Sequence, residues 1–251
     1  MAEVSLCIPV FNSAAFLDGL FSCLRALSPP PAEIILLDDA STDDSALLLH
    51  EFSENPTLGV PVRVLVNERN LGIAGAYNRL VREARHEWIQ LLDADDLLVG
   101  RDFYDRIEPA LNSAADLVIV ALTSNARLLH WGATMFGWIV PRRPPLWWPL
   151  LGSFSTRAGV LYRRLRLIDH PFYDPAYPGS DVIHLLELRR EGLCIYLRKP
   201  QVLYRVHPDS QSSRHRDYSV YRSDLKRFGL VVRTMHRLDL RLRQLVQKAV
   251  R

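Results

Sequence analysis

Apolar runs and segments of helical periodicity alternate over the first 95 residues of the chain. The apolar runs have the length and composition of buried strands, and they span residues 4–10, 33–37, 62–66 and 87–92. Between them, apolar side chains recur at three- and four-residue intervals, which predicts one buried face on each intervening helix. These predicted helices cover residues 17–27, 46–52 and 73–84. Strands that alternate with helices in this way form a parallel sheet with helices on both faces.

The pattern after residue 95 is less regular. It predicts strands over 116–122, 158–162, 193–197 and 202–206, with a helix from Asp181 to Gly192. The last two strands are expected to be separate, because Lys199-Pro200 lies between them. Four of the five tryptophans fall within residues 124–153, among several prolines. Tryptophan rings suit stacking on sugars as well as packing beneath a long loop, and the pattern leaves both readings open.

Polar residues gather where the predicted strands end. Asn12 follows the first strand, Asp39 the second, and Asp93-Ala94-Asp95-Asp96 the fourth. In open parallel sheets, ligands bind outside these carboxyl ends. Three carboxylates within four residues repel one another unless a cation lies among them, and Mg²⁺ and Mn²⁺ prefer such oxygen ligands. A solvated acidic turn is the alternative that the spacing alone leaves open.

Two capping patterns also follow these strands. Asn12 and Ser13 are placed to cap the first helix, and Ser41 with Asp44 has the capping-box spacing ahead of the second helix.

Composition and cysteine usage narrow the class of protein. The chain has 48% hydrophobic and 24% charged residues, which is ordinary for a soluble globular protein. Three widely spaced cysteines predict reduced core thiols in a cytoplasmic protein, not a disulfide or zinc framework. We expect no signal peptide and no bilayer-spanning segment. The G-x-G-x-x-G fingerprint is absent, which argues against a nicotinamide enzyme.

Charge is distributed unevenly along the chain. Residues 219–251 carry nine basic residues against two acidic ones, so this stretch has a net charge of +7 within a total of +3. Its apolar residues recur at helical spacing. Such a helix either covers the body of the protein or attaches it to an anionic membrane, at the inner face of the cell membrane. No recognition motif for nucleic acid accompanies the basic residues.

With these motifs in their order, residues 4–213 resemble the family 2 glycosyltransferases of the GT-A fold. The resemblance is carried by Ile8-Pro9-Val10-Phe11-Asn12, Leu37-Asp38-Asp39-Ala40-Ser41-Thr42-Asp43, Asn70-Leu71-Gly72 with Ala76 and Asn78, Asp93-Ala94-Asp95-Asp96-Leu97, Gly179-Ser180-Asp181 and Tyr204 to Ser212. It implies an α/β GT-A domain over 1–213, with a mostly parallel sheet flanked by helices. The nucleotide-binding half would be 1–98 and the acceptor half 99–213, followed by a basic amphipathic helical tail over 214–251.

The resemblance also implies an activity and a set of roles. The expected reaction is inverting transfer of a sugar from a nucleoside-diphosphate donor, with UDP the first choice, to a saccharide or lipid-linked acceptor in polysaccharide biosynthesis. The implied general base is Asp181. The implied ligands of Mn²⁺ or Mg²⁺ are Asp95, Asp96 and His207. The implied donor-binding residues are Pro9, Phe11, Asn12, Asp39, Asn70, Asp93, Ala94, Asp95 and Arg205. The segment that is rich in tryptophan and proline has no counterpart in the family pattern, and we assign acceptor contacts to its Trp138, Trp147 and Trp148 because such rings suit stacking on sugars.

Two positions depart from the family pattern, and two other readings remain. Ser180 stands where an acidic residue usually precedes the base, and Tyr77 stands where arginine is frequent. Asp181 could instead cap its helix, and His207 could be a surface histidine. A catalytically silent GT-A-like domain that binds a nucleotide or a protein is the alternative function. A nucleotidyltransferase would need a glycine- and lysine-rich loop after the first strand, which is absent.

Overall fold

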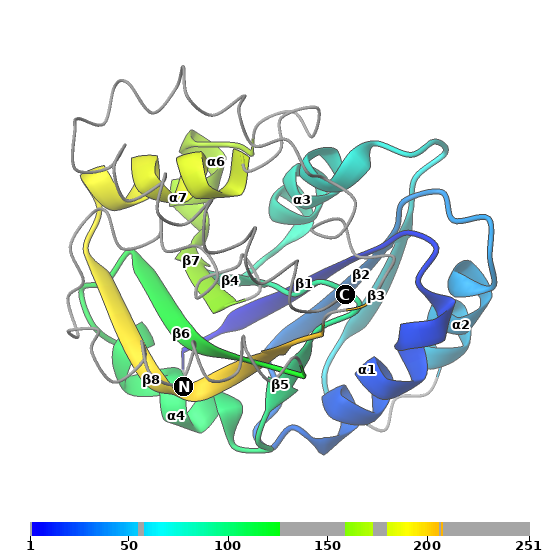
Figure 1. Ribbon diagram of the computed structural model, residues 1–251, viewed down its shortest axis with the longest axis horizontal. Helices are drawn as coiled ribbons and strands as arrows, with labels where there is room; N and C mark the ends of the chain where they lie inside the picture. Colours follow the sequence, from blue (N-terminus) through cyan, green and yellow to red (C-terminus); the bar gives the residue numbers. More distant parts are fainter. Residues whose placement is uncertain (1, 55–57, 126–158, 173–179, 206, 208–251) are drawn as a thin grey trace.

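The computed structural model describes residues 2–54, 58–125, 159–172, 180–205 and 207 (Figure 1). The first half contains β1 (Val4–Val10), α1 (Ala14–Ala26), β2 (Glu33–Asp38), α2 (Ser45–Ser53), β3 (Val62–Val66), α3 (Gly72–Glu83) and β4 (Trp88–Leu91). The second half contains β5 (Leu97–Val99), α4 (Phe103–Leu111), β6 (Leu117–Ser124), β7 (Val160–Arg163), α6 (Arg164–Asp169), α7 (Ser180–Glu191) and β8 (Cys194–Tyr204). The tryptophans at 138, 147 and 148 and the tail over 214–251 lie outside the described residues.

The eight described strands form one sheet in the order β3-β2-β1-β4-β7-β6-β8-β5. The first four are parallel to one another, as the alternating pattern predicted. The second half is mixed, because β7 runs antiparallel to both β4 and β6, while β6 and β8 are parallel. The carboxyl end of β4 therefore lies near the middle of the sheet, where the parallel and mixed halves meet.

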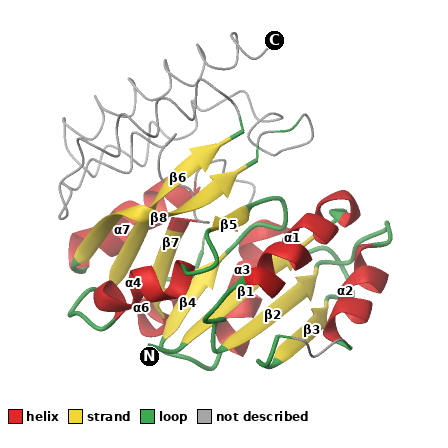
Figure 2. Cartoon of the chain, turned by 90° about the horizontal axis from the view of Figure 1, so that it is seen from below, coloured by secondary structure: helices red, strands yellow, loops and turns green. Residues whose placement is uncertain are grey.

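Helices cover both faces of the sheet (Figure 2). Leu6 and Ile8 of β1 face the layer formed by α1, α2 and α4, whereas Cys7 faces the layer that includes α3, α6 and α7. Every residue of β1 and β2 is buried, which explains why these strands are continuous apolar runs. Among the described residues, no helix is both long and apolar enough to cross a bilayer.

Some predicted elements need correction. The strands expected at 193–197 and 202–206 form one strand, β8, whose register on β6 jumps from Leu197 to Gln201. The intervening residues 198–200 make a bulge, because Pro200 has no N–H to donate to the ladder. The sequence reasoning also missed β5, α4 and α6. Of these, β5 is only three residues long and is defined by its pairing with β8, which no local pattern reveals.

The predicted helix caps were wrong in detail. Neither Ser13 nor Asp44 makes a side-chain cap, although each immediately precedes its helix. Instead, the Asp43 carboxylate accepts hydrogen bonds at the first residues of both helices. Its Oδ2 accepts from the N–H of Ala14 (3.0 Å) and its Oδ1 from the N–H of Ser45 (3.0 Å). One carboxylate thus ties α1 to α2, and these hydrogen bonds outweigh the effect of burial and lower the pKa of Asp43.

The three cysteines are free thiols, as predicted. Cys7 and Cys194 are buried. Burial raises the pKa of both thiols, that of Cys194 to about 11, so they behave as small apolar core residues.

A buried carboxylate joins the amino ends of the strands. Glu33 is 2% exposed and accepts hydrogen bonds from the Ser5 hydroxyl (2.7 Å), the Arg85 N–H (2.8 Å) and the Arg63 guanidinium (3.0 Å). Burial by itself would raise the pKa of Glu33, but these hydrogen bonds lower it by more, so that it lies below its ordinary value. The charged form is therefore the one that the fold stabilises.

Glu33→Gln should lower the free energy of unfolding by about 2 kcal/mol at neutral pH, because an amide N–H₂ would face Arg63 and the charge-assisted hydrogen bonds would be lost. Since the folded-state pKa is depressed, the contribution of Glu33 is full above the ordinary carboxyl pKa. It disappears as the pH falls through the folded-state value. Denaturant unfolding of both proteins from neutral pH into acid measures this. Glu51→Gln, on the exposed side of α2, is the matched control, and a gap that persists in acid would contradict the assignment.

Candidate functional site

Three carboxylates meet directly after β4, near the middle of the sheet. Asp93, Asp95 and Asp96 each place one oxygen so that these atoms lie within 4.8 Å of one another. The turn is closed by a hydrogen bond from the N–H of Asp96 to the carbonyl of Asp93 (3.0 Å). The convergence predicted from the sequence is therefore present. We refer to these three residues as the carboxylate cluster.

Asp96 is the buried member of the cluster. Its exposed fraction is 0%, and its Oδ1 accepts from the N–H of Arg205 (3.1 Å). Its Oδ2 is buried and accepts no hydrogen bond from the part of the chain that the structure describes. Burial, together with the charges of Asp93 and Asp95, raises the pKa of Asp96 well above its ordinary value. A buried oxygen that none of the described residues contacts by a hydrogen bond, and that lies among like charges, fits a divalent cation as its partner.

The strand end at Arg205 encloses the cluster from the other side. The Arg205 guanidinium donates to the main-chain carbonyls of Asp95 and Ala94, and it lies 5.2 Å from the Phe16 ring centroid. His207 Nε2 lies 2.9 Å from Asp95 Oδ2, and the His207 ring packs on Phe16 at 4.5 Å. Arg205 therefore supports the turn that carries the carboxylates, while a contact between Arg205 and a diphosphate stays a prediction.

Asp39 lies at the neighbouring strand end and is almost fully buried. Its Oδ1 accepts from Asn67 Nδ2 (2.5 Å) and from the N–H of Leu71 (2.9 Å), and Asn67 is in turn held by Arg79. None of the described residues donates a hydrogen bond to Oδ2 of Asp39. The carboxylate is thus fixed through one oxygen and has the other available, which suits the predicted hydrogen bond from a base N–H.

The loops after β1 and β2 are strained and braced against each other. Asn12 and Ala40 adopt left-handed backbone conformations, with φ of 48° and 60°. Asn12 Oδ1 accepts from the N–H of Thr42 (2.8 Å), so this amide oxygen holds the loop. Phe11 is 47% exposed beside it, which leaves its ring accessible for stacking, whereas Pro9 is buried in β1.

Two other predicted donor-binding residues, Asn70 and Ala94, have hydrogen-bond partners within the protein. Asn70 Oδ1 accepts from the N–H of Gly72 (2.8 Å) and so shapes the start of α3. Ala94 is buried and offers its carbonyl to Arg205. A donor-binding role for either residue stays a prediction.

Tyr77 is a neighbour of the cluster that the sequence reasoning missed. This fully buried residue of α3 donates its hydroxyl hydrogen bond to Oδ1 of Asp93. The sequence marked Tyr77 only as a departure from the arginine that is frequent there. Its apolar spacing on α3 signalled burial, but the contact with Asp93 depends on how α3 packs across the carboxyl end of β4.

Asp181 is the second residue of α7 and not the residue before it, which disfavours a role as helix cap. Its side chain is not described.

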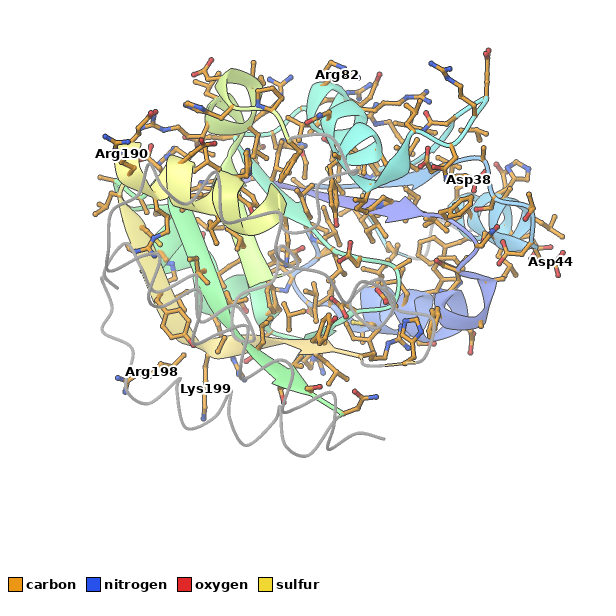
Figure 3. The ribbon with its side chains drawn as sticks, turned by 45° about the horizontal axis from the view of Figure 1, so that its top comes forward. Asp38, Asp44, Arg82, Arg190, Arg198 and Lys199 are labelled. Carbon is orange, nitrogen blue, oxygen red and sulfur yellow. The ribbon has the colours of Figure 1, made fainter. Side chains whose placement is uncertain are left out.

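Figure 3 shows that several labelled charged residues of opposite sign lie on opposite sides of the molecule. Asp38 and Asp44 lie on the side of α1 and α2, whereas Arg190, Arg198 and Lys199 lie on the other side.

A family model and several curated relatives match this chain, and all of them are glycosyltransferases or polysaccharide synthases. The model of glycosyl transferase family 2 matches residues 5–147. An uncharacterized glycosyltransferase of Haemophilus influenzae is 32% identical over 113 residues, which are 45% of this chain and 42% of that protein. The poly-beta-1,6-N-acetyl-D-glucosamine synthase of Staphylococcus aureus is 23% identical over 82% of this chain and 50% of its own length. The chain thus spans half or less of the length of these curated relatives.

Solved structures share the fold. S. aureus TarS in complex with UDP-GlcNAc has a TM-score of 0.67 at 16% identity, covering 83% of this chain and 60% of that one. The mannosyltransferase PcManGT from Pyrobaculum calidifontis, in complex with GDP-Man and Mn²⁺, has a TM-score of 0.69 at 16% identity, covering 98% and 74%. These likenesses confirm the predicted GT-A architecture.

Asp96→Asn should stabilise the protein in the absence of metal by about 1–2 kcal/mol, because it removes a buried charge from the carboxylate cluster while retaining an acceptor for Arg205. The folded-state pKa of Asp96 is raised, so the gain should be largest above that value. It should shrink as the pH falls toward the ordinary carboxyl pKa, where the wild-type residue is protonated. Denaturant unfolding in EDTA across this pH range tests the prediction.

The matched control is Asp105→Asn, which neutralises an exposed carboxylate in the first turn of α4 and should leave stability nearly unchanged or slightly lower. A destabilised Asp96→Asn protein would contradict the picture of crowded carboxylates.

Proposed function

The chain belongs to glycosyl transferase family 2, and on that premise we propose that it transfers a sugar from a nucleoside-diphosphate donor to a saccharide or lipid-linked acceptor, with inversion. The observation that carries the proposal is the carboxylate cluster near the middle of the sheet, where a buried oxygen of Asp96 has no partner among the described residues. Asp39 is further evidence for a nucleotide site at the adjacent strand ends. Its Oδ1 is fixed by Asn67 and Leu71, and none of the described residues donates to its Oδ2.

Mn²⁺ or Mg²⁺ is the proposed cofactor, held by Asp95, Asp96 and His207, with Asp93 beside them. When bound, such a cation would neutralise the charge that develops on the departing nucleoside diphosphate. The residues themselves contribute geometry: Arg205 fixes the turn through the carbonyls of Asp95 and Ala94, and His207 contacts Asp95 from the end of β8. Asp93 is oriented by the hydroxyl of Tyr77.

Asp181 is the proposed general base. In a single displacement, its carboxylate takes the proton from an acceptor hydroxyl while the acceptor oxygen bonds to the anomeric carbon. The bond between that carbon and the diphosphate oxygen breaks, and its electron pair leaves with the nucleoside diphosphate. Two observations support this role: Asp181 lies near the start of α7, and it ends the Gly179-Ser180-Asp181 motif, in which the family resemblance places the base.

The proposed acceptor and donor nucleotide follow from the relatives. The S. aureus relative is named as a synthase of a polysaccharide, which favours a saccharide or lipid-linked acceptor for this chain as well. The neighbours contain UDP-GlcNAc or GDP-Man, so both nucleotides are candidates, with UDP the first choice. Contacts of the acceptor with Trp138, Trp147 and Trp148, and of residues 219–251 with an anionic membrane, stay predictions.

A thermal-shift panel tests the donor and the cofactor together. UDP- and GDP-sugars should raise the unfolding temperature in Mn²⁺ and have little effect in EDTA, because a cation held by the carboxylates would offset the charge of the diphosphate. Asp95→Ala should weaken the metal-dependent binding, with Asp105→Asn as the control. Calorimetric affinities that are equal with and without metal would remove the cofactor assignment.

Asp181→Asn should retain donor affinity and lose turnover by about 10²–10⁴-fold, as expected when a base is removed. The amide keeps the shape of the side chain but cannot accept the proton. Donor affinity from calorimetry and product formation from radiolabelled donor separate the two effects. Donor binding without turnover in the wild-type protein would instead indicate the nucleotide-binding domain that lacks catalysis, and an equal loss of affinity would mean that Asp181 is not the base.

A further inference from the structure

A side-chain amide joins two parts of the chain that are 94 residues apart. Asn78, in the middle of α3, donates from Nδ2 to the carbonyl of Phe172 (3.0 Å). Its Oδ1 accepts from the N–H of the same residue (2.8 Å). Asn78 therefore satisfies both main-chain groups of Phe172, as a neighbouring strand would. Phe172 lies after α6 and eight positions before Ser180, where α7 begins.

The ring of Phe172 connects α3 to α7. It is 6% exposed and packs 5.4 Å from the ring of Tyr77 and 4.2 Å from the ring of His184 on α7. His184 also donates from Nε2 to the carbonyl of His170 (2.6 Å), so α7 contacts this segment through its main chain as well. Leu185 of α7 belongs to the same apolar layer.

The other end of this connection is the carboxylate cluster. Tyr77 precedes Asn78 on α3, and its hydroxyl donates to Asp93. Two adjacent residues of α3 therefore have different partners. Tyr77 contacts the carboxylate cluster, and Asn78 contacts Phe172, which packs on α7, the helix that carries Asp181. His184 lies three residues beyond Asp181 on α7, within one helical turn.

We infer that Asn78 is a positioning residue: by pinning Phe172 to α3, it sets where the start of α7, and with it Asp181, lies relative to the carboxylate cluster. The inference rests on the proposed function, because it needs Asp181 on the acceptor side and the donor at the cluster. Asn78 touches neither the donor nor the reacting atoms in this scheme. Small displacements of a catalytic group lower turnover strongly. We therefore expect the loss of these hydrogen bonds to lower kcat and to leave donor affinity nearly unchanged.

The alternative is that the two hydrogen bonds of Asn78 serve stability alone. In that case their loss would lower the unfolding temperature without a selective effect on turnover of the folded protein. The two readings therefore differ in how kcat, donor affinity and local opening of α7 respond to the same substitution.

The experiment compares Asn78→Ala with Asn78→Asp in the full chain. Asn78→Ala removes both hydrogen bonds to Phe172. Asn78→Asp has nearly the same shape and keeps the acceptor for the Phe172 N–H, but it replaces the donor by a charged oxygen that faces the Phe172 carbonyl. Asn112→Ala, at the exposed C-cap of α4, is the matched control. Three quantities are measured: hydrogen exchange of the Phe172 amide and of residues 180–191, calorimetric affinity for a nucleoside diphosphate with Mn²⁺, and kcat.

In Asn78→Ala we expect faster exchange at Phe172 and across α7, while exchange in β1 and α1 stays unchanged. We expect donor affinity within about twofold of wild type and a kcat lower by roughly 10–100-fold. Asn78→Asp should protect the Phe172 amide and give an intermediate kcat. If Asn78→Ala does not fold, Asn78→Asp alone still has to show the intermediate loss of kcat with donor affinity retained.

An unchanged kcat, or a kcat and a donor affinity that fall by the same factor, would overturn the inference. A proposed function that fails is distinguishable from this outcome. In that case Asp181→Asn would retain wild-type turnover, or the wild-type protein would show none, whatever the exchange data report for Asn78.

Discussion

The mutual repulsion of three carboxylates at the end of β4 is the constraint on which the site depends. Asp96 is the most demanding of them, because it is buried and one of its oxygens has no partner among the described residues. The described groups around this turn hold it largely through its main chain. Arg205 directs its guanidinium to main-chain carbonyls, and Tyr77 offers Asp93 a neutral hydroxyl. Among the described residues, these contacts leave the carboxylates close together, and a bound cation would relieve the repulsion between them.

The parallel half of the sheet explains why these groups can meet. Parallel strands present their carboxyl ends at one edge, so Asp39 after β2 and the cluster after β4 lie on the same edge. The loops at this edge are held in conformations that their residues do not prefer, with Asn12 and Ala40 in the left-handed region. Asp43 compensates by accepting hydrogen bonds at the starts of both α1 and α2. Strain at the loop tips is thus offset by polar contacts directly behind them.

The sequence predicted the parallel half well because its signals are local. Fully buried strands give continuous apolar runs, and amphipathic helices such as α3 give clear periodicity. It failed where structure is decided by distant partners: β5 exists through β8, and Asp43 displaces the expected caps because two helix starts converge on it. α4 is different, since Phe103, Tyr104, Ile107 and Leu111 have helical spacing, although Pro109 lies within the helix. Within the site, the cluster was predictable from one motif, whereas the contact between Tyr77 and Asp93 required the packing of α3.

The groups around the carboxylate cluster come from both halves of the sheet, so the site is complete only when both halves are folded. The carboxylates come from the first half of the sheet, but Arg205 and His207 arrive from the end of β8, 109 to 112 residues later in the chain. β8 lies beside the cluster because it pairs with β5, directly after the carboxylates, and with β6 in the mixed half, so the turn is fully restrained only when β8 is in place. A cation held by Asp95, Asp96 and His207 would therefore favour the complete sheet over a folded parallel half alone. By linkage, its binding free energy would contribute to the cooperativity between the two halves.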